Sequence, residues 1–457
     1  MVQKDRLIYM SSDVHSTLTT DQAELGRNTL RRVSTRLLPF LIALYIWAWI
    51  DRTNLAIAAL EMKQDLHLSS SAYGLGAGIF FLGYALFEVP SNLILAKVGA
   101  RLWIARIMIT WGFASAATMF AVDAWSLFGL RALVGAAEAG FLPGILLYLT
   151  YWFPRSCRAR ANALFIMGIP ATIAIASTIS GFIMQMDGWF GLAGWQWLFL
   201  LEGLPAVVFG IICLFYLDDS PARANWLSGD EKREIAARLE QDRALEENEH
   251  GKRSVLSQLG SRNVVLLCAA YFGLIVSLNA NSTWVPQIVQ GLAGGTSYAV
   301  IGLLTALPAI VTVAVMPSWG ASSDRRNERV WHLRIALLFA AVGWLLVIGS
   351  NVAIARYFGL VLVSAGSFCA LLTFWTIPVA ILSPAARPAG IAFINTIGIG
   401  GGSAISPLVI GYLKDLTGGF TSGLIYVIAM LIMSVICVTI VAAQMRTPAP
   451  VPSPSHA

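Results

Sequence analysis

Residues 129–144 read Gly-Leu-Arg-Ala-Leu-Val-Gly-Ala-Ala-Glu-Ala-Gly-Phe-Leu-Pro-Gly, which places Arg131 and Glu138 inside an otherwise apolar run. Seven residues are close to two helical turns, so both side chains leave one face of a helix, about 10 Å apart along its axis. A charged side chain in hydrocarbon costs about 3 kcal/mol or more, so such groups face protein or water and pair. The two residues form either a structural ion pair or a proton-binding acid beside an anion-binding base. We favour the second, because ionisable residues within membranes are functional by default.

The apolar character extends over the whole chain of 457 residues, of which 57% are hydrophobic and 12% are charged, with a mean hydropathy of +0.70. Soluble proteins carry about 25% charged residues, so the sequence indicates an integral membrane protein. The net charge of +6 does not indicate nucleic-acid binding, because the basic residues gather in alternate loops. No cysteines are spaced as in a metal cluster, and the five histidines fall outside the apolar runs except His332, the second residue of one. We therefore expect no cofactor, no metal, and a proton path built from carboxylates.

Apolar runs of about 20 residues, the length that crosses a bilayer, recur along the chain. They predict twelve transmembrane helices, an all-α membrane fold, near residues 37–60, 75–96, 102–122, 126–152, 161–185, 197–217, 264–288, 298–319, 331–350, 355–382, 389–413 and 423–444. The predicted domains are a mobile cytosolic tail (1–35), a six-helix half (36–217), a cytosolic linker (218–263), a second six-helix half (264–444) and a disordered C-terminal tail (445–457).

The distribution of basic residues gives the orientation. The tails and the loops on one side hold 26 Lys and Arg, whereas the other side holds only Lys63, Arg356 and Lys414. By the positive-inside rule both termini lie in the cytosol, and we expect a multi-pass protein of a bacterial inner membrane.

The two halves carry similar segments at corresponding positions. Leu95-Ala-Lys-Val-Gly-Ala-Arg101 follows the second span, and Gly320-Ala-Ser-Ser-Asp-Arg-Arg326 follows the eighth; Ala96 and Asp324 are 228 residues apart. A repeat of six helices is typical of a transporter whose halves rock around a midplane site.

At this point the sequence resembles the major facilitator superfamily, and within it the anion:cation symporter group. The resemblance is carried by Trp49-Ile-Asp-Arg-Thr-Asn-Leu-Ala56, Leu86-Phe-Glu-Val-Pro-Ser-Asn92, Arg131-Ala-Leu-Val-Gly-Ala-Ala-Glu-Ala-Gly140 and Gly194-Trp-Gln-Trp-Leu-Phe-Leu-Leu-Glu-Gly-Leu-Pro205. The chain looks most like bacterial permeases for 4-hydroxyphenylacetate, and tartrate and phthalate permeases share many of these segments. The resemblance implies gating charges at Asp324 and Arg325. After the second span Ala96 and Lys97 stand where the family has Asp and Arg.

Four charged residues of the first half form the predicted site. Counting helical rise from each membrane surface puts Asp51 and Arg131 at similar depth, so that they can pair, and puts Glu138 within reach of Arg52. A carboxylate substrate needs a cation in a low-dielectric cavity, and an arginine offers a two-pronged donor. We take Arg52 first and Arg131 second for this role, and the resemblance ties Asp51 and Glu138 to protons. We interpret Glu88 and Glu202 as structural. No predicted span of the second half contains an acid.

Polar and aromatic side chains are expected to line the rest of the cavity. Candidates are Tyr45, Trp49, Tyr84, Asn279, Asn281, Trp375 and Asn395. A buried asparagine needs partners, which a substrate hydroxyl or a neighbouring helix could equally supply. The resemblance implies substrate contacts for Tyr84, Trp375 and Asn395.

These observations predict a proton-coupled symporter that imports a small organic carboxylate, with an aromatic acid such as 4-hydroxyphenylacetate as the first choice. The alternatives are a tartrate, phthalate or sugar-acid symporter, an anion exchanger, and a sensor that binds without transporting. No nucleophile elbow or phosphate loop is present, so the chain is not expected to be an enzyme. The expected partners are an organic anion, protons and the lipid bilayer, with no nucleic acid, and the protein is expected to be a monomer.

Overall fold

The computed structural model describes residues 2–249, 260–382 and 386–446. Its longer elements are helices α1 (Val2–Asp65), α2 (Ser70–Val98), α3 (Ala100–Ala117), α4 (Ala124–Glu138), α5 (Phe141–Trp152), α6 (Arg155–Ile183), α7 (Gly194–Tyr216), α8 (Gly229–Glu249), α10 (Arg262–Ala293), α11 (Tyr298–Arg326), α12 (Val330–Gly349), α13 (Ala353–Phe374), α14 (Thr376–Ile381), α15 (Arg387–Asn395), α16 (Ser403–Thr417) and α17 (Thr421–Arg446). A π-helical segment, Thr396–Gly402, joins α15 to α16.

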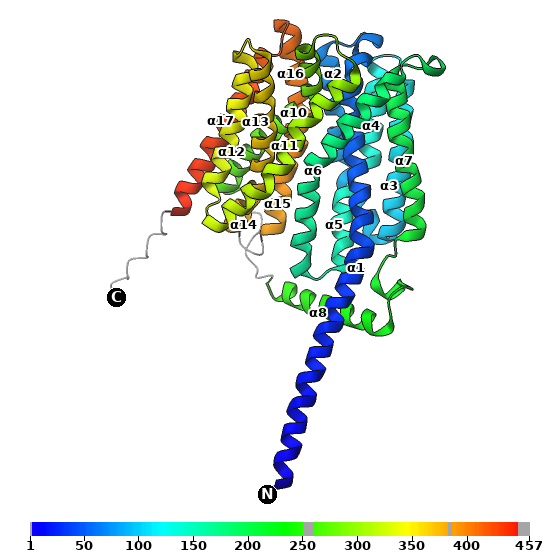
Figure 1. Cartoon of the computed structure of the whole chain (residues 1–457), viewed down its shortest axis with the longest axis vertical. Helices are drawn as coiled ribbons and strands as arrows, with labels where there is room; N and C mark the ends of the chain where they lie inside the picture. Colours follow the sequence, from blue (N-terminus) through cyan, green and yellow to red (C-terminus); the bar gives the residue numbers. More distant parts are fainter. Residues whose placement is uncertain (1, 250–259, 383–385, 447–457) are drawn as a thin grey trace, which may run out of the picture.

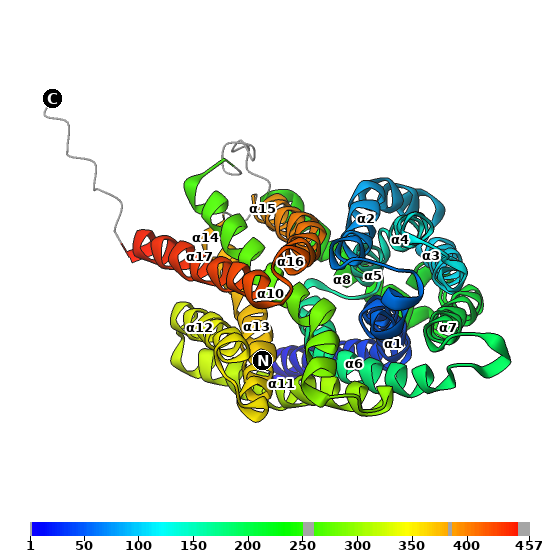
Figure 2. The same ribbon diagram turned by 90° about the horizontal axis from the view of Figure 1, so that it is seen from above.

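Within these residues, twelve helical stretches are long and apolar enough to cross a membrane, which confirms the predicted all-α membrane fold. Each contains most of one predicted span. The fourth span consists of α4 and α5, and the tenth of α13 and α14. Seen from above, α1–α7 gather in one bundle and α10–α17 in another (Figure 2). The long axes of the spans run together, and α8 lies at the end nearest the N-terminus (Figure 1).

The two bundles meet closely at the end far from α8. There Asp415 of α16 accepts hydrogen bonds from the backbone amides of Ser70 and Ser71 at the start of α2, at 2.9 and 2.7 Å. A carboxylate suits a helix N-terminus, where amides lack partners. Next to it Gly74 faces the backbone of Pro407, and a Cβ built on Gly74 would lie 2.2 Å from the Pro407 carbonyl oxygen. Glycine is therefore required for the backbones to approach this closely.

Residues 2–35, within the predicted cytosolic tail, are helical, because α1 begins at Val2 and continues into the first span. Part of this extension is attached to α8 by the ion pair of Arg32 with Glu231, at 3.1 Å. Glu231 also accepts a hydrogen bond from the Ser228 amide and so belongs to the cap of α8. Burial opposes ionisation of Glu231, but the hydrogen bonds from Ser228 and Arg32 outweigh it and hold its pKa below the usual value. Of the predicted C-terminal tail (445–457), residues 447–457 lie outside the described residues.

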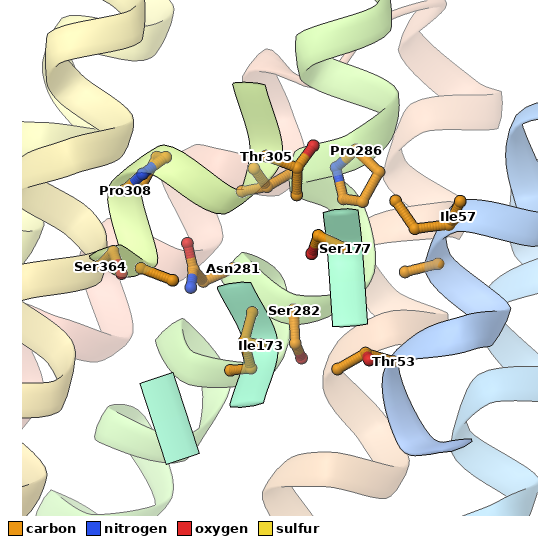
Figure 3. Close-up of a pocket in the computed structure, with 13 residues that line it drawn as sticks. Thr53, Ile57, Ile173, Ser177, Asn281, Ser282, Pro286, Thr305, Pro308 and Ser364 are labelled. Carbon is orange, nitrogen blue, oxygen red and sulfur yellow. The ribbon is translucent and has the colours of Figure 1, made fainter. Parts of the chain in front are cut away.

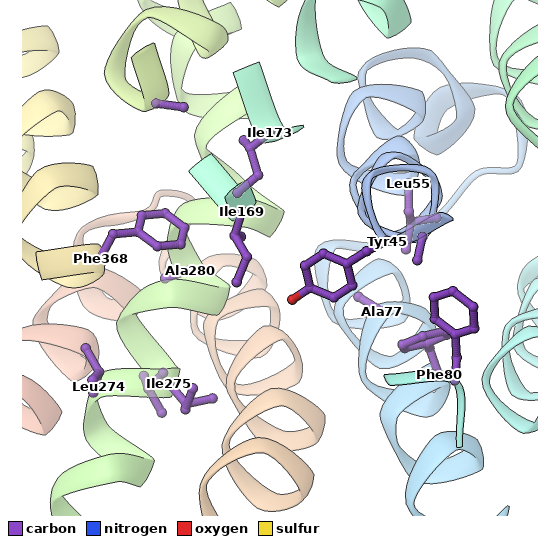
Figure 4. Packing of buried hydrophobic residues seen from close by; sticks show 14 of the residues in the cluster. Tyr45, Leu55, Ala77, Phe80, Ile169, Ile173, Leu274, Ile275, Ala280 and Phe368 are labelled. Carbon is purple, nitrogen blue, oxygen red and sulfur yellow. The ribbon is translucent and has the colours of Figure 1, made fainter. Parts of the chain in front are cut away.

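Apolar side chains fill the space between the helices of each bundle. The rings of Phe80 and Phe368 and the aliphatic chains of Leu55, Ile173 and Leu274 belong to one buried cluster. Tyr45 belongs to it too, and its hydroxyl points from α1 toward the helices of the other bundle (Figure 4). The core thus presents a polar tip where the two bundles face each other.

Candidate functional site

Arg52 and Glu138 form an ion pair between α1 and α4. The Arg52 Nη2 atom lies 2.6 Å from Glu138 Oε1, and Nε donates to the same oxygen at 2.7 Å. The glutamate side chain is fully buried, whereas 20% of the arginine side chain is exposed. The second carboxylate oxygen, Oε2, is buried without a hydrogen-bond partner among the described residues. The pair therefore combines an accessible cation with an acid that has one vacant oxygen.

Aromatic rings surround the Arg52 guanidinium. Its Cζ lies 5.2 Å from the centre of the Tyr84 ring and 5.6 Å from those of Trp49 and Phe80. Tyr45 packs edge-on against Trp49 at 6.3 Å. Cation–π attraction favours a guanidinium among such faces. The structure thus brings together Arg52, Glu138, Tyr45, Trp49 and Tyr84.

Asp51 is enclosed separately, which corrects the expected pairing with Arg131. The indole Nε1 of Trp111 donates to Asp51 Oδ2 at 2.6 Å, Asn54 Nδ2 donates to Oδ1 at 3.0 Å, and the Ser115 hydroxyl also donates to Oδ1. No ion pair of Asp51 occurs in the part of the chain that the structure describes. Depth along a helix axis predicted a possible contact, but α3 supplies the donors that fill the shell around this carboxylate.

Trp111 and Ser115 are functional candidates that the sequence reasoning missed. They lie four residues apart on α3, so both project from one face toward α1. A tryptophan and a serine at this spacing within a span were the available signal, although each is common in membrane helices.

Arg131 is buried on α4, with 3% of its surface exposed. Its Cζ lies 4.9 Å from the centre of the Phe80 ring, and its Nε has no hydrogen-bond partner among the described residues. A buried guanidinium with unfilled donor capacity is costly unless charges nearby compensate it. Asp51 and Glu138 are both close enough to attract it electrostatically. Because it is less accessible than Arg52, Arg131 fits a charge-balancing role better than first contact with a substrate.

The fourth span breaks directly after Glu138. Helix α4 ends there, Ala139 leaves the helical conformation, and Gly140 has a φ of +83° before α5 starts at Phe141. A side chain at Gly140 would meet Ser91, since a built Cβ would lie 2.5 Å from the serine Oγ. Broken helices in transporters often carry the binding site, because they release backbone groups at membrane depth.

Two spans of the second bundle also break at predicted site residues. Trp375 stands between α13 and α14, and Asn395 ends α15 before the π-helical segment. Both side chains are partly exposed. Tyr271 of α10, which the sequence reasoning missed, packs against Trp375 with ring centres 4.9 Å apart and stacks on Phe374 at 4.8 Å. Tyr271, Phe374 and Trp375 thus form an aromatic cluster, and Asn395 precedes a π-helical turn, a feature frequent at functional sites.

The two asparagines of the seventh span separate into different roles. Asn279 donates to the Ile275 carbonyl at 3.0 Å and to the Ser403 hydroxyl at 2.8 Å, which makes it a link between α10 and α16; its role as a substrate contact stays a prediction. Asn281 instead lines a small cavity between the two bundles (Figure 3). The cavity receives hydroxyl groups from Thr53, Ser177, Ser282, Thr305 and Ser364.

The predicted gating charges lie at the end of α11, and one of them has a local partner among the described residues. Asp324, at the end of α11, forms an ion pair with Arg329 just before α12. Arg325 is exposed and has no ion pair among the described residues. Asp324 and its partner lie within one helix–loop–helix corner, and the gating role of Asp324 and Arg325 stays a prediction. Within the described residues, no group of three His, Cys, Asp or Glu side chains is placed to hold a metal ion.

Two six-span bundles, interrupted helices and a charged pair buried within the first bundle define a membrane protein of the secondary-transporter class. The chain belongs to the Major Facilitator Superfamily, whose model matches residues 41–407. It is therefore a transporter of a small molecule and not an enzyme.

Curated relatives match along most of the chain. A protein of Agrobacterium vitis named "Putative tartrate transporter" is 44% identical over 92% of this chain and 96% of its own length. A quinolone resistance transporter of Acinetobacter baumannii is 36% identical over 93% and 97%. The inner membrane transport protein RhmT of Escherichia coli is 35% identical over 88% and 93%. These relatives support transport and leave the expected likeness to 4-hydroxyphenylacetate permeases as a prediction.

A solved structure supports the fold. The bacterial homologue of the human lysosomal transporter Spinster, in an inward-facing and unoccupied conformation, superposes with a TM-score of 0.74. It is 18% identical, and the match covers 92% of this chain and 99% of that one. At this identity the likeness concerns architecture alone.

Proposed function

We propose that the protein is a proton-coupled importer of a small hydroxycarboxylate, with tartrate as the first candidate substrate. The observation that carries the proposal is the Arg52–Glu138 ion pair, in which an accessible guanidinium is held by a buried acid. The 44% identity to the Agrobacterium vitis protein supports the choice of tartrate. The basic loops favour both termini in the cytosol of a bacterial inner membrane.

Coupling follows from charge balance in a low-dielectric site. While Glu138 is ionised, its carboxylate binds the Arg52 guanidinium and keeps those donors from a substrate. A proton on the vacant Oε2 neutralises the acid and weakens its hold on the guanidinium, which then accepts a substrate carboxylate. Proton and anion therefore favour each other's binding, which is the coupling that symport requires. Arg131 and Asp51 supply a second opposite pair of charges that keeps the site balanced.

The substrate hydroxyls have possible partners at the bundle interface. The cavity of Figure 3 carries five hydroxyl-bearing side chains and the amide of Asn281. The hydroxyls of Thr53, Ser282 and Thr305 already donate to backbone carbonyls, so their oxygens are left to accept hydrogen bonds from substrate hydroxyls. This environment supports a polyhydroxy acid.

The second candidate is an aromatic acid, favoured by the stacked rings of Tyr271, Phe374 and Trp375. Competition decides between the two: excess 4-hydroxyphenylacetate should leave uptake of labelled tartrate unchanged if the hydroxycarboxylate is the substrate. Strong inhibition by the aromatic acid, with no uptake of tartrate, would reverse the order.

The decisive experiment uses purified protein in liposomes and the variant Glu138→Gln. Wild-type protein should accumulate labelled tartrate when the outside is acidic, without internal substrate. The variant should lose accumulation by at least tenfold and retain exchange of external for internal tartrate, because a neutral amide mimics the protonated acid. Full proton-driven accumulation by the variant would remove Glu138 from coupling. Uptake by the wild type that ignores the pH gradient and requires internal substrate would make the protein an exchanger.

A further inference from the structure

Two lysines from opposite bundles converge on one glutamine at the end of the molecule far from α8. The Nζ of Lys63, on α1, and the Nζ of Lys414, on α16, each lie 3.4 Å from Gln287 Oε1 on α10. The ammonium groups are therefore no more than twice that distance apart. Lys63 also donates to the Ser70 hydroxyl at 3.1 Å. Both lysines are only partly exposed.

These two positive charges share a single nearby carboxylate, that of Asp415, so the cluster keeps a net positive charge. Neither lysine forms an ion pair among the residues that the structure describes. The adjacent carboxylate, Asp415, is hydrogen-bonded through both oxygens to the amides at the start of α2. Like charges this close repel, and holding both against a single neutral acceptor is unfavourable.

The two other acids near Lys63 on α1 face a different helix. Glu61 accepts a hydrogen bond from the Trp195 amide at 3.2 Å, and Asp65 accepts from the Trp195 indole at 2.7 Å. Both contacts are with α7, so these acids do not compensate the lysine pair.

The surroundings are rich in donors and aromatic rings. The indole Nε1 of Trp284 is buried without an acceptor among the described residues. Lys414 lies 3.9 Å from the centre of the Phe420 ring and 5.7 Å from that of Trp284, and Lys63 lies 5.8 Å from that of Tyr73. A cluster with unused donors and two cations, whose one carboxylate already accepts hydrogen bonds from two backbone amides, has the chemistry of an anion site.

We propose that Lys63 and Lys414 form an outer recruitment site for the carboxylate of the transported anion. The proposal rests on the proposed import of an organic acid. The basic loops put the end far from α8 outside the cell, so we call it the outer end. The lysines belong to opposite bundles, and opening of the outer end therefore separates them and exposes their donors to the outside. A cation pair at a narrow entrance raises the local concentration of anions and speeds their encounter. The captured anion then passes inward to Arg52, the next accessible cation along α1.

The test measures the kinetics of tartrate entry from the outside in Lys63→Gln, Lys414→Gln and the double variant. Each single variant should raise KM about tenfold at low ionic strength with little change in kcat, because recruitment controls encounter and not turnover. The difference should shrink as salt is added. Lys63→Arg and Lys414→Arg, which keep the charge, should behave like the wild type. Arg356→Gln serves as the matched control, since it removes the third outer cation, whose Nε donates to the Val347 carbonyl.

An unchanged KM with unchanged salt dependence in folded Gln variants would overturn the proposal, and so would a fall in kcat alone. If the wild type carries no tartrate, the proposed substrate fails, and the site is tested without transport. Acylation of Lys63 and Lys414 by a membrane-impermeant amine reagent, read by peptide mass spectrometry, should slow in sulfate relative to chloride at equal ionic strength. Equal rates in the two salts would overturn the recruitment site independently.

Discussion

At the scale of residues, the protein separates the tasks of two acids and two bases. One carboxylate oxygen of Glu138 accepts hydrogen bonds from Arg52, and the other has no partner among the described residues. Both oxygens of Asp51, in contrast, accept hydrogen bonds, from Trp111, Ser115 and Asn54. A proton or a substrate can change the contacts of the first acid without rebuilding a hydrogen-bond shell. The accessible base and the vacant oxygen lie on the same pair, and this is why we place coupling there.

Replacing Arg52 by lysine should raise KM for tartrate at least tenfold and reduce proton-driven uptake. Lysine keeps the charge but loses the planar fork that places both Nε and Nη2 on the glutamate. The measurement is initial uptake in liposomes over a range of substrate concentrations. Arg356→Lys, at the outer surface, is the control and should leave KM unchanged. If Arg52→Lys also kept the wild-type KM, the guanidinium would not be the substrate's partner.

At the scale of elements, the site depends on where helices stop. The fourth, tenth and eleventh spans are interrupted beside Glu138, at Trp375 and after Asn395. Hydropathy predicted that these spans exist, because a run of apolar residues long enough to cross a bilayer can be recognised directly in the sequence. It could not predict the interruptions, which depend on a few dihedral angles. Gly140 was the visible sign in the fourth span, Pro378 in the tenth and the glycine run 398–402 in the eleventh, but none of them fixes where the helix changes.

The pairing of side chains was predictable only in part, for a related reason. Counting residues gives the depth of a group but not the direction in which it points around the bundle. The contact of Arg52 with Glu138 agrees with the depths counted along their helices. Asp51 instead points toward α3 and forms no ion pair with Arg131 among the described residues. The lysine pair at the outer end joins segments 351 residues apart, and no local pattern indicated it.

Gly140→Ala should destabilise the break in the fourth span. An L-residue at a φ of +83° is strained by about 1–2 kcal/mol, and the added Cβ would also collide with Ser91. We expect a melting temperature lower by several degrees and a loss of most proton-driven uptake, because Glu138 shifts with the break. Gly129→Ala is the matched control on the same span, since a Cβ there meets nothing within 4 Å. Equal stability and uptake in the two variants would show that the break is not needed.

At the scale of the whole molecule, the two bundles are joined at the outer end by backbone contacts as well as by the cap of Asp415 on α2. Contacts that depend on the absence of a side chain are sensitive to a single methyl group. Rocking of two bundles requires that these contacts form and break in every cycle. Variants that oppose their formation should therefore slow the cycle without touching the charged site.

Gly74→Ala tests this, because its Cβ would lie 2.2 Å from the Pro407 carbonyl oxygen when the outer end is closed. We expect the uptake rate at saturating tartrate to fall at least fivefold while KM does not rise, since closure and not capture is impaired. The conformational shift is read from a cysteine at Ser70, which is 7% exposed, in a background without native cysteines. An impermeant maleimide added outside should label it faster in Gly74→Ala than in the parent or in Gly349→Ala, whose Cβ meets open space. Unchanged labelling with full uptake would mean that α2 and α16 separate too little during transport for this contact to matter.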